Sequence, residues 1–345
     1  MKAMKFCAAT TSLVALGSLF ATQAAADPVA DFYRGKHVSL YVGSDAGGGY
    51  DNYARLVARH LGRFIPGNPD VIVQNMPGGG GIRVTNNLYN IAPKDGTAIG
   101  LVQRAILNMP LLEARKSEFH YDPLKFRWLG SLNTETGLII VSSAAPQKEM
   151  KDLFEQELLV GSSNPTTDYM PLFLNNVLGT KFKIISGYKS SNDVYLALDR
   201  GEVQGRVSNG WAGDQGMLKP WIDTGKVRLL AQLSTAKSAI FPDVPLITDF
   251  AKTERQRQAM DLILSAQLWG RPFLMPPGVP DDRFHAVQKA FLDMSKNAEF
   301  LADAKKAGID IDIVTGDEID TLLRRVYATP PDIVELVRKA VGQAK

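Results

Sequence analysis

The chain has 345 residues, with 39 Lys and Arg against 36 Asp and Glu, so its formal net charge at pH 7 is only +3. This near-neutral charge gives no support for a nucleic-acid partner or for binding to a membrane surface. The length exceeds that of one typical hydrophobic core and predicts two domains.

The N-terminal residues have the order of a cleaved secretory signal. Two lysines precede an apolar run over 8–20, and three alanines end at Ala26. The run is short for a membrane span; the alternative is a buried N-terminal helix. We expect residues 1–26 to be a signal peptide, cleaved after Ala26, with the periplasm as destination. Cleavage removes Cys7, the only cysteine, so the mature chain has neither a disulfide nor a thiolate.

Strands and helices alternate in the first part of the chain. Apolar, β-branched runs predict strands over 38–42, 71–73 and 98–102. Helical spacing predicts helices over 51–64 and 83–90. The third strand delivers Gln103 and Arg104 to its C-terminal end.

The pattern starts again near residue 130. Further strands are predicted over 138–141, 158–160, 182–185, 203–207 and 227–230, with helices over 168–178 and 192–200. Apolar stripes from residue 284 onward predict a helical C-terminal part. Alternation of this kind favours parallel sheets with helical crossovers. We therefore expect an α/β fold of two units, with the C-terminal helices packed back on the first.

The glycine-rich loop after the first strand is the strongest functional signal. Gly47-Gly48-Gly49 stands between a strand and a helix, where bare backbone N–H groups and the helix dipole favour an anion. Asp51 is placed to cap that helix. The alternative is a tight turn without a ligand. The loop matches neither the phosphate-binding Gly-Lys-Ser/Thr pattern nor the dinucleotide pattern.

Other residues near strand ends are weaker candidates. The four glycines from Gly78 to Gly81 could form a second wall of amides or a flexible turn. Arg104, and less so Arg83, could grip a carboxylate through two parallel hydrogen bonds. Asp45 is awkward for an anion site and could hold a cation, a donor group or a water.

The second unit offers small polar groups in its loops. Hydroxyls are present at Ser162, Ser163, Thr166 and Thr167, and amides at 188–191 just before a helix. Turn and capping chemistry is the alternative for all of them.

Trp211, beside Asn209, could form the wall of a pocket or simply pack in the core. The four histidines have no metal-ligand spacing, and Gly-x-Ser-x-Gly is absent. We therefore expect no enzyme activity, no metal and no cofactor.

Several motifs together resemble the periplasmic receptors of tripartite tricarboxylate transporters, also called the Bug family, over essentially the whole mature chain. The likeness lies in Gly47-Gly48-Gly49-Tyr50-Asp51, Asn75-Met76-Pro77-Gly78-Gly79-Gly80-Gly81, Ala92-Pro93-Lys94-Asp95-Gly96-Thr97, Tyr188-Lys189-Ser190 with Leu198-Asp199-Arg200-Gly201-Glu202-Val203, and Phe241-Pro242-Asp243-Val244-Pro245. Each motif is loose, but their order and spacing are specific.

The resemblance implies a two-lobed periplasmic binding protein of the type II class, with the ligand between the lobes. We expect lobe 1 to comprise 27–133 plus 236–345 and lobe 2 to comprise 134–235, with hinges near 130–136 and 233–241. The expected ligand-binding residues are Ser44, Asp45, Ala46, Gly47, Gly48, Gly49, Asp51, Gly80, Gln103, Arg104, Ser162, Ser163, Thr166, Thr167, Lys189, Ser190, Asn209 and Trp211.

The implied function is capture of a small di- or tricarboxylate, or a related organic acid, for delivery to a membrane permease, by a protein expected to be a monomer. Gly43-Ser44-Asp45-Ala46 replaces the usual Pro-Phe-x-Pro of the family, and Ser190 replaces its usual glycine, so the resemblance does not fix the ligand. The alternatives are a receptor that signals to a membrane sensor and a secreted enzyme that binds a phosphate-bearing cofactor.

Overall fold

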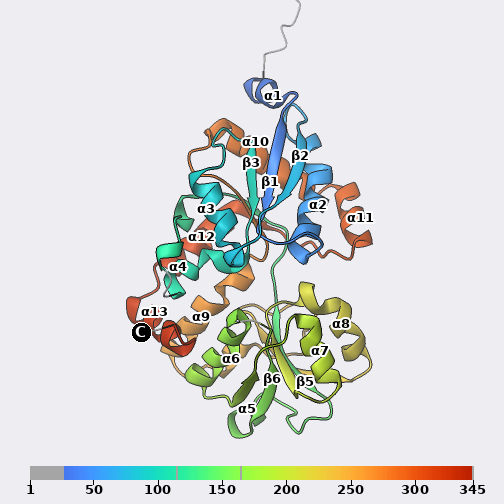
Figure 1. Ribbon diagram of the computed structural model, residues 1–345, viewed down its shortest axis with the longest axis vertical. Helices are drawn as coiled ribbons and strands as arrows, with labels where there is room; N and C mark the ends of the chain where they lie inside the picture. The colour runs from blue at the N-terminus through green and yellow to red at the C-terminus, as the bar shows by residue number, and fades with distance from the viewer. Residues whose placement is uncertain (1–26, 114–115, 164, 344–345) are drawn as a thin grey trace, which may run out of the picture.

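The computed structural model describes residues 27–113, 116–163 and 165–343. The predicted signal peptide lies outside these residues. The described chain forms two lobes, stacked along the long axis of Figure 1 and joined by extended segments. Each lobe is built around one β-sheet, which we call sheet A in lobe 1 and sheet B in lobe 2.

Sheet A has six strands in the order β11-β4-β10-β3-β1-β2. In chain order the strands are β1 (His37–Val42), β2 (Asp70–Asn75), β3 (Ala98–Leu101), β4 (Arg127–Ser131), β10 (Pro272–Met275) and β11 (Val314–Thr315). The strands β2, β1 and β3 are parallel, whereas β10 runs antiparallel to both of its neighbours.

Sheet B has five strands in the order β7-β6-β8-β5-β9. They are β5 (Gly137–Ser142), β6 (Leu158–Gly161), β7 (Phe182–Ile185), β8 (Gly205–Ser208) and β9 (Val227–Leu233). The strands β7, β6 and β8 are parallel, and β5 lies antiparallel between β8 and β9.

The helices of lobe 1 are α1 (Pro28–Tyr33), α2 (Gly49–Leu61), α3 (Ile82–Asn90), α4 (Met109–Leu112), α10 (Asp281–Ser295), α11 (Ala298–Lys306) and α12 (Gly316–Tyr327), with short 3₁₀ turns η2 (Gly79–Gly81) and η3 (Arg104–Leu107). Those of lobe 2 are α5 (Asp152–Glu155), α6 (Pro165–Leu178), α7 (Ser191–Asp199) and α8 (Trp211–Asp223). Two more, α9 (Glu254–Leu268) and α13 (Pro331–Ala340), lie beside both lobes. Within the described ranges, no helix is both long enough and apolar enough to cross a membrane.

The parallel pairing with helical crossovers that the sequence favours holds for part of each sheet. Each sheet contains an antiparallel strand beside the parallel ones, β10 in sheet A and β5 in sheet B. The chain leaves lobe 1 through β4 and enters lobe 2 directly through β5, without a helical crossover. A strand that follows directly from its predecessor has no need of the parallel direction that a βαβ unit imposes.

The C-terminal helices pack back on lobe 1, as expected. α10 and α12 cover β4, and α11 packs against α2. The last helix, α13, also reaches lobe 2, because Asn176 on α6 donates a hydrogen bond of 2.8 Å to the carbonyl oxygen of Ala340. Gln256 on α9 makes a second link to α6, with a hydrogen bond of 2.7 Å to the carbonyl oxygen of Val177. One side of the molecule is therefore fastened across both lobes.

Candidate functional site

The β1–α2 loop is held by a buried carboxylate. Asp51 is 1% exposed and accepts hydrogen bonds from the backbone N–H of Gly47 at 2.7 Å, from Arg55 Nε at 2.8 Å and from Asn75 Nδ2 at 2.9 Å. Asn75 also donates to the carbonyl oxygen of Ser44 at 3.0 Å. The end of β2 and the loop after β1 are thereby fixed to the first turn of α2.

The charge of Asp51 is stabilised in place. Burial opposes the ionised form, but the hydrogen bonds from Arg55, Gly47 and Asn75 outweigh it, so the pKa of Asp51 lies below its usual value. Asp51 stands in the third position of α2 and reaches back to Gly47, while Gly48 is the N-cap residue. The predicted capping role of Asp51 is therefore wrong: Gly48 begins the helix without a side-chain cap, and Asp51 instead holds the N–H of Gly47, which precedes the helix.

The backbone N–H of Gly47, which was expected to face an anionic ligand, instead donates to a carboxylate of the protein itself. The N–H of Gly47 points at Asp51, and its φ of +83° is one that a side chain would strain. Residues 45–49 are exposed to solvent, and Ser44 is half-buried. In the second glycine loop Gly80 is also exposed and faces Met109, whose Cε would lie 3.7 Å from a Cβ at that position.

Arg104 lies at the point where the two lobes meet. Its backbone N–H donates to the hydroxyl of Tyr50 at 3.1 Å, and its carbonyl oxygen accepts from the indole N–H of Trp269 at 3.0 Å. Its guanidinium donates to the carbonyl oxygen of Asn209, in lobe 2, at 2.5 Å. The neighbouring Gln103 donates to the carbonyl oxygen of Gly43 at 3.2 Å and so turns toward the β1 loop.

Two arginines share one buried carboxylate here. Glu135, 3% exposed, lies on the segment that passes from β4 to β5. Its Oε1 is 2.7 Å from Arg271 Nη1 and 3.5 Å from Arg104 Nη1. Arg271, 4% exposed, is stacked 4.4 Å from the ring centre of Tyr53. We call Arg104, Glu135 and Arg271 the arginine cluster; two cations and one anion give it an excess positive charge.

The same carboxylate touches the beginning of α8. Glu135 Oε2 accepts from the backbone N–H of Ala212 at 3.3 Å. A Cβ on Gly210 would lie 2.5 Å from Glu135 Oε2 and 3.2 Å from Arg104 Nη2. Only a residue without a side chain allows this approach, so Gly210 sets the distance between lobe 2 and the arginine cluster.

A cavity of about 240 Å³ lies between the lobes, beside Arg104. Its walls come from η3 and α4 of lobe 1, from α6 and the end of β8 in lobe 2, and from α9. It is lined by Tyr50, Gln103, Arg104, Ala105, Asn108, Met109, Leu112, Glu113, Tyr169, Met170, Asn209, Ile263, Ala266 and Gln267. Apolar walls with a few convergent polar groups are typical of small-molecule sites. We call it the interlobe cavity.

The structure thus brings three expected residues to one cavity: Gln103, Arg104 and Asn209. Among the residues described, none of the β1–α2 loop lines the cavity, and from the first turn of α2 only Tyr50 does. Glu113 also lines the cavity and is buried. The positive charge of the lining therefore comes from Arg104, and an acidic residue lies elsewhere in the same lining.

The loop after β6 is closed upon itself. Ser162 is buried, and its Oγ is hydrogen-bonded to Thr167 Oγ1, while its N–H donates to the carbonyl oxygen of Ile185 at 2.9 Å. Ser163 is half-buried. The side chain of Thr166 lies outside what the structure describes. These residues connect β6 to the start of α6, the helix that contributes Tyr169 and Met170 to the cavity.

Lys189 and Ser190 are exposed at the start of α7. Ser190 is the N-cap: its Oγ accepts from the N–H of Asp193 at 3.3 Å and donates to the Asp193 carboxylate at 2.8 Å. This is the capping chemistry that the sequence left open as an alternative.

Trp211 is 8% exposed and packs edge-on against Phe241, with ring centres 4.9 Å apart. It belongs to the core of lobe 2. Trp211 also lines another cavity, together with residues 133–136. Trp211 therefore packs mainly in the core, which was the alternative to its forming the wall of a pocket.

Sequence reasoning missed Glu135 and Arg271, the partners that orient Arg104. One signal was available: Glu135 is the only charge between Arg127 and Lys148, and Arg271 is the only charge between Asp261 and Asp281. A buried charge requires a partner, so their opposite charges make these two residues candidates for a pair once both are known to be buried. The α9 residues that line the cavity, Ile263, Ala266 and Gln267, could not be recognised in this way, because none of them is charged.

Two mixed sheets, joined by extended segments and enclosing a small cavity with an arginine at its edge, define the class of two-lobed solute-binding proteins. The sequence profile described as "Tripartite tricarboxylate transporter family receptor" matches residues 54–323. The chain therefore belongs to this receptor family. Membership makes it a receptor and not an enzyme.

Individual relatives are distant. A protein of Cupriavidus necator described as "UPF0065 protein in gbd 5'region" is 27% identical over 231 residues, which cover 64% of this chain and 66%, just under two thirds, of that protein. A TctC solute-binding protein from Polaromonas is 18% identical with a TM-score of 0.69, covering 89% of this chain and 99% of its own. A Rhodopseudomonas palustris protein solved with adipate is 19% identical with a TM-score of 0.62, covering 90% of this chain and 98% of its own. These similarities show the fold.

Proposed function

We propose that this receptor binds a small organic carboxylate in the interlobe cavity and delivers it to the membrane permease of a tripartite tricarboxylate transporter. The observation that carries the proposal is the position of Arg104, which lines the cavity and touches both lobes. Two arginines share one carboxylate in the arginine cluster, and its excess positive charge attracts an anion.

Lobe closure supports the same assignment. Arg104 holds the carbonyl oxygen of Asn209 across the gap, and a bound carboxylate would accept from the same guanidinium, because Arg can donate in two directions at once. A ligand at this place joins the lobes and strengthens their contact. The structure solved with adipate, in a protein of the same fold, makes an acid of that size a reasonable first probe.

Most of the expected ligand-binding residues fall into two groups under this proposal; Asp51, Gly80 and Trp211 belong to neither. Gln103, Arg104 and Asn209 would touch the ligand in the closed cavity. The loops at 44–49 and 189–190, with Ser162, Ser163 and Thr167, would border its entrance. We propose 27–133 plus 236–345 and 134–235 as the two lobes; segment 238–245 hydrogen-bonds to Gln232 of β9 and so lies at the boundary.

Export to the periplasm is part of the proposal. It rests on the charged, apolar and small-residue order of residues 1–26. N-terminal sequencing of protein recovered from a periplasmic extract should begin at Asp27. Protein that retains Met1 in that extract would contradict it. We propose a monomer, which sedimentation of the mature chain would check.

Calorimetric titration with adipate, malate and citrate tests the ligand. We expect one of these acids to bind at one site per chain, without being consumed. Arg104→Gln should weaken that binding about tenfold or more, since a charge-assisted hydrogen bond contributes about 1.5–3 kcal/mol. Arg83→Gln is the matched control, because Arg83 is exposed and points to the carbonyl oxygen of Pro77.

Unchanged affinity in Arg104→Gln, or no binding of any acid, would overturn the site assignment. Delivery is tested separately, by uptake of the bound acid into vesicles that contain the permease. Binding without uptake would favour the alternative of a receptor that reports to a membrane sensor.

A further inference from the structure

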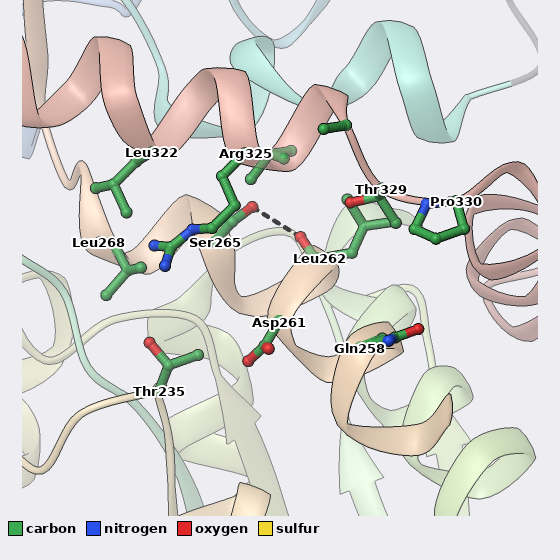
Figure 2. Close-up of a pocket in the computed structure, with 12 residues that line it drawn as sticks. Thr235, Gln258, Asp261, Leu262, Ser265, Leu268, Leu322, Arg325, Thr329 and Pro330 are labelled. Carbon is green, nitrogen blue, oxygen red and sulfur yellow. Dashed lines mark hydrogen bonds between the residues drawn. The ribbon is translucent and has the colours of Figure 1, made fainter. Parts of the chain in front are cut away.

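A second hollow lies on the opposite side of α9 from the interlobe cavity. It has a volume of about 540 Å³ and is formed by α9, by α12 with the turn that follows it, and by the segment after β9. Its lining residues are Thr235, Gln258, Asp261, Leu262, Ser265, Leu268, Leu322, Arg325, Val326, Ala328, Thr329 and Pro330 (Figure 2). We call it the α9–α12 groove. Because Ile263, Ala266 and Gln267 of α9 line the interlobe cavity, one helix separates the two.

Two opposite charges project into this groove from its two walls. Figure 2 shows the guanidinium of Arg325 extending from α12 into the space between the helices, and the carboxylate of Asp261 projecting from α9. Among the ion pairs of the described residues, none at 4.0 Å or less joins Asp261 or Arg325. The neighbouring Arg324, in contrast, is paired with Asp320 at 2.7 Å on its own helix.

The two charges nevertheless sense each other. Desolvation by the groove walls raises the pKa of Asp261, and the charge of Arg325 acts in the opposite direction. Glu254, on the preceding turns of α9, adds to the rise. Asp261 and Arg325 are thus near enough to interact through the groove and too far apart to satisfy each other's hydrogen bonds.

The rest of the lining is largely apolar. Leu262, Leu268, Leu322 and Val326 form the floor, with Pro330 at one end. The hydroxyl of Ser265 is already used, since it donates to the carbonyl oxygen of Leu262 at 2.7 Å. Gln258 and Thr235, both half-buried, add polar groups to the lining.

A complementary ligand must carry an anion and a cation on one small apolar body. The anion would accept from the guanidinium of Arg325, which offers parallel donors to a carboxylate. An ammonium group would donate to Asp261. The apolar body would cover the leucine floor and remove it from water. A ligand with only one charge would leave one of the two groups without a partner.

We propose that the α9–α12 groove is a second binding site, for a small zwitterion such as an amino acid with an apolar body. The site is separate from the interlobe cavity and does not depend on the function proposed for it. Its occupant would touch lobe 1 and, through Thr235, the segment by which the chain leaves β9 of lobe 2.

The test is calorimetric titration of the mature protein with two zwitterions, leucine and 5-aminopentanoate. Each has two controls of similar shape that lack one charge: 4-methylpentanoate and 3-methylbutylamine for leucine, pentanoate and pentylamine for 5-aminopentanoate. We expect at least one zwitterion to bind, and its single-charge analogues to bind about tenfold more weakly or worse.

Substitutions of the two charged residues test whether the zwitterion binds in the groove. Arg325→Gln and Asp261→Asn should each weaken the zwitterion about tenfold or more, and both residues are exposed, so the fold is expected to survive. Arg324→Gln, on the same helix, should bind as the wild type does. The proposal fails if neither zwitterion binds, if the analogues bind equally well, or if affinity is the same in Arg325→Gln as in Arg324→Gln.

Discussion

The guanidinium of Arg104 donates a hydrogen bond of 2.5 Å to the carbonyl oxygen of Asn209, so a side chain of lobe 1 holds the backbone of lobe 2. The contact lies at the edge of the interlobe cavity, which both residues line. Opening of the lobes must break it. Arg104 therefore connects the charge at the binding site with the relative position of the lobes.

The first prediction concerns Glu135, which compensates Arg104 and Arg271. Glu135→Gln leaves the buried Arg271 and the half-buried Arg104 without this counter-ion, and loss of one partner from a buried ion pair costs about 3 kcal/mol or more. We expect urea denaturation to show a loss of that size in the free energy of unfolding. Asp320→Asn, which removes an exposed pair with Arg324, should change stability little. Equal effects of the two substitutions would contradict the assigned burial of the cluster.

The second prediction concerns pH. The folded-state pKa of Asp51 lies below its unfolded value because of its three hydrogen bonds. Its contribution to stability is therefore complete above the unfolded pKa, about 3.9, and is lost as the pH falls through the folded pKa. At pH 7 we expect Asp51→Asn to lower the free energy of unfolding by about 2 kcal/mol.

The difference between Asp51→Asn and the wild type should shrink below about pH 4, where the wild-type carboxylate begins to be protonated. Urea denaturation at pH 7, 5 and 3 measures this. A difference that is constant over that range would show that the charge of Asp51 does not hold the loop.

The third prediction concerns Gly210. Gly210→Ala places a Cβ within 2.5 Å of Glu135 Oε2, and we expect it to cost about 1–3 kcal/mol through overpacking and to weaken binding of the acid. Gly213→Ala, in the helix α8 that follows Gly210, is the control, because a Cβ there has nothing within 4 Å and alanine favours a helix. If both variants bind the acid as the wild type does, the approach at Gly210 has no part in the site.

The fourth prediction separates capping from ligand binding at Ser190. Ser190→Ala removes the N-cap of α7 and should lower stability by about 1 kcal/mol, whereas Ser190→Asn, also a good N-cap residue, should restore it. Thermal unfolding without ligand checks this. If the ligand affinity of Ser190→Asn equals that of the wild type while its stability is restored, the residue acts as a cap alone.

Local patterns predicted much of the fold. The strand at 182–185 has the predicted bounds, and those at 38–42 and 71–73 agree within two residues at each end. The antiparallel strands β10 and β11 were not predicted, because a strand of two to four residues has too little periodicity to be detected and depends on neighbours far away in the chain.

The site was predicted only in part, for a physical reason. The strand-end position of Arg104 is visible in the sequence, since ligands gather at the carboxyl ends of strands. Whether a glycine N–H in a loop faces a ligand or a carboxylate of the protein depends on where that carboxylate lies. Here the carboxylate of Asp51 accepts the hydrogen bond from the N–H of Gly47. The link between Arg271 and Glu135 joins residues 136 positions apart and could be inferred only from their burial.

The hydrogen bonds from Asn176 to Ala340 and from Gln256 to Val177 both lie on one flank of the molecule. They tie α6 of lobe 2 to α13 and α9 along that flank. A rotation of the lobes that keeps both bonds must turn about that flank, so the opposite flank, where α2 and α7 lie (Figure 1), would move furthest. A crosslink between α2 and α7 should then prevent the lobes from opening.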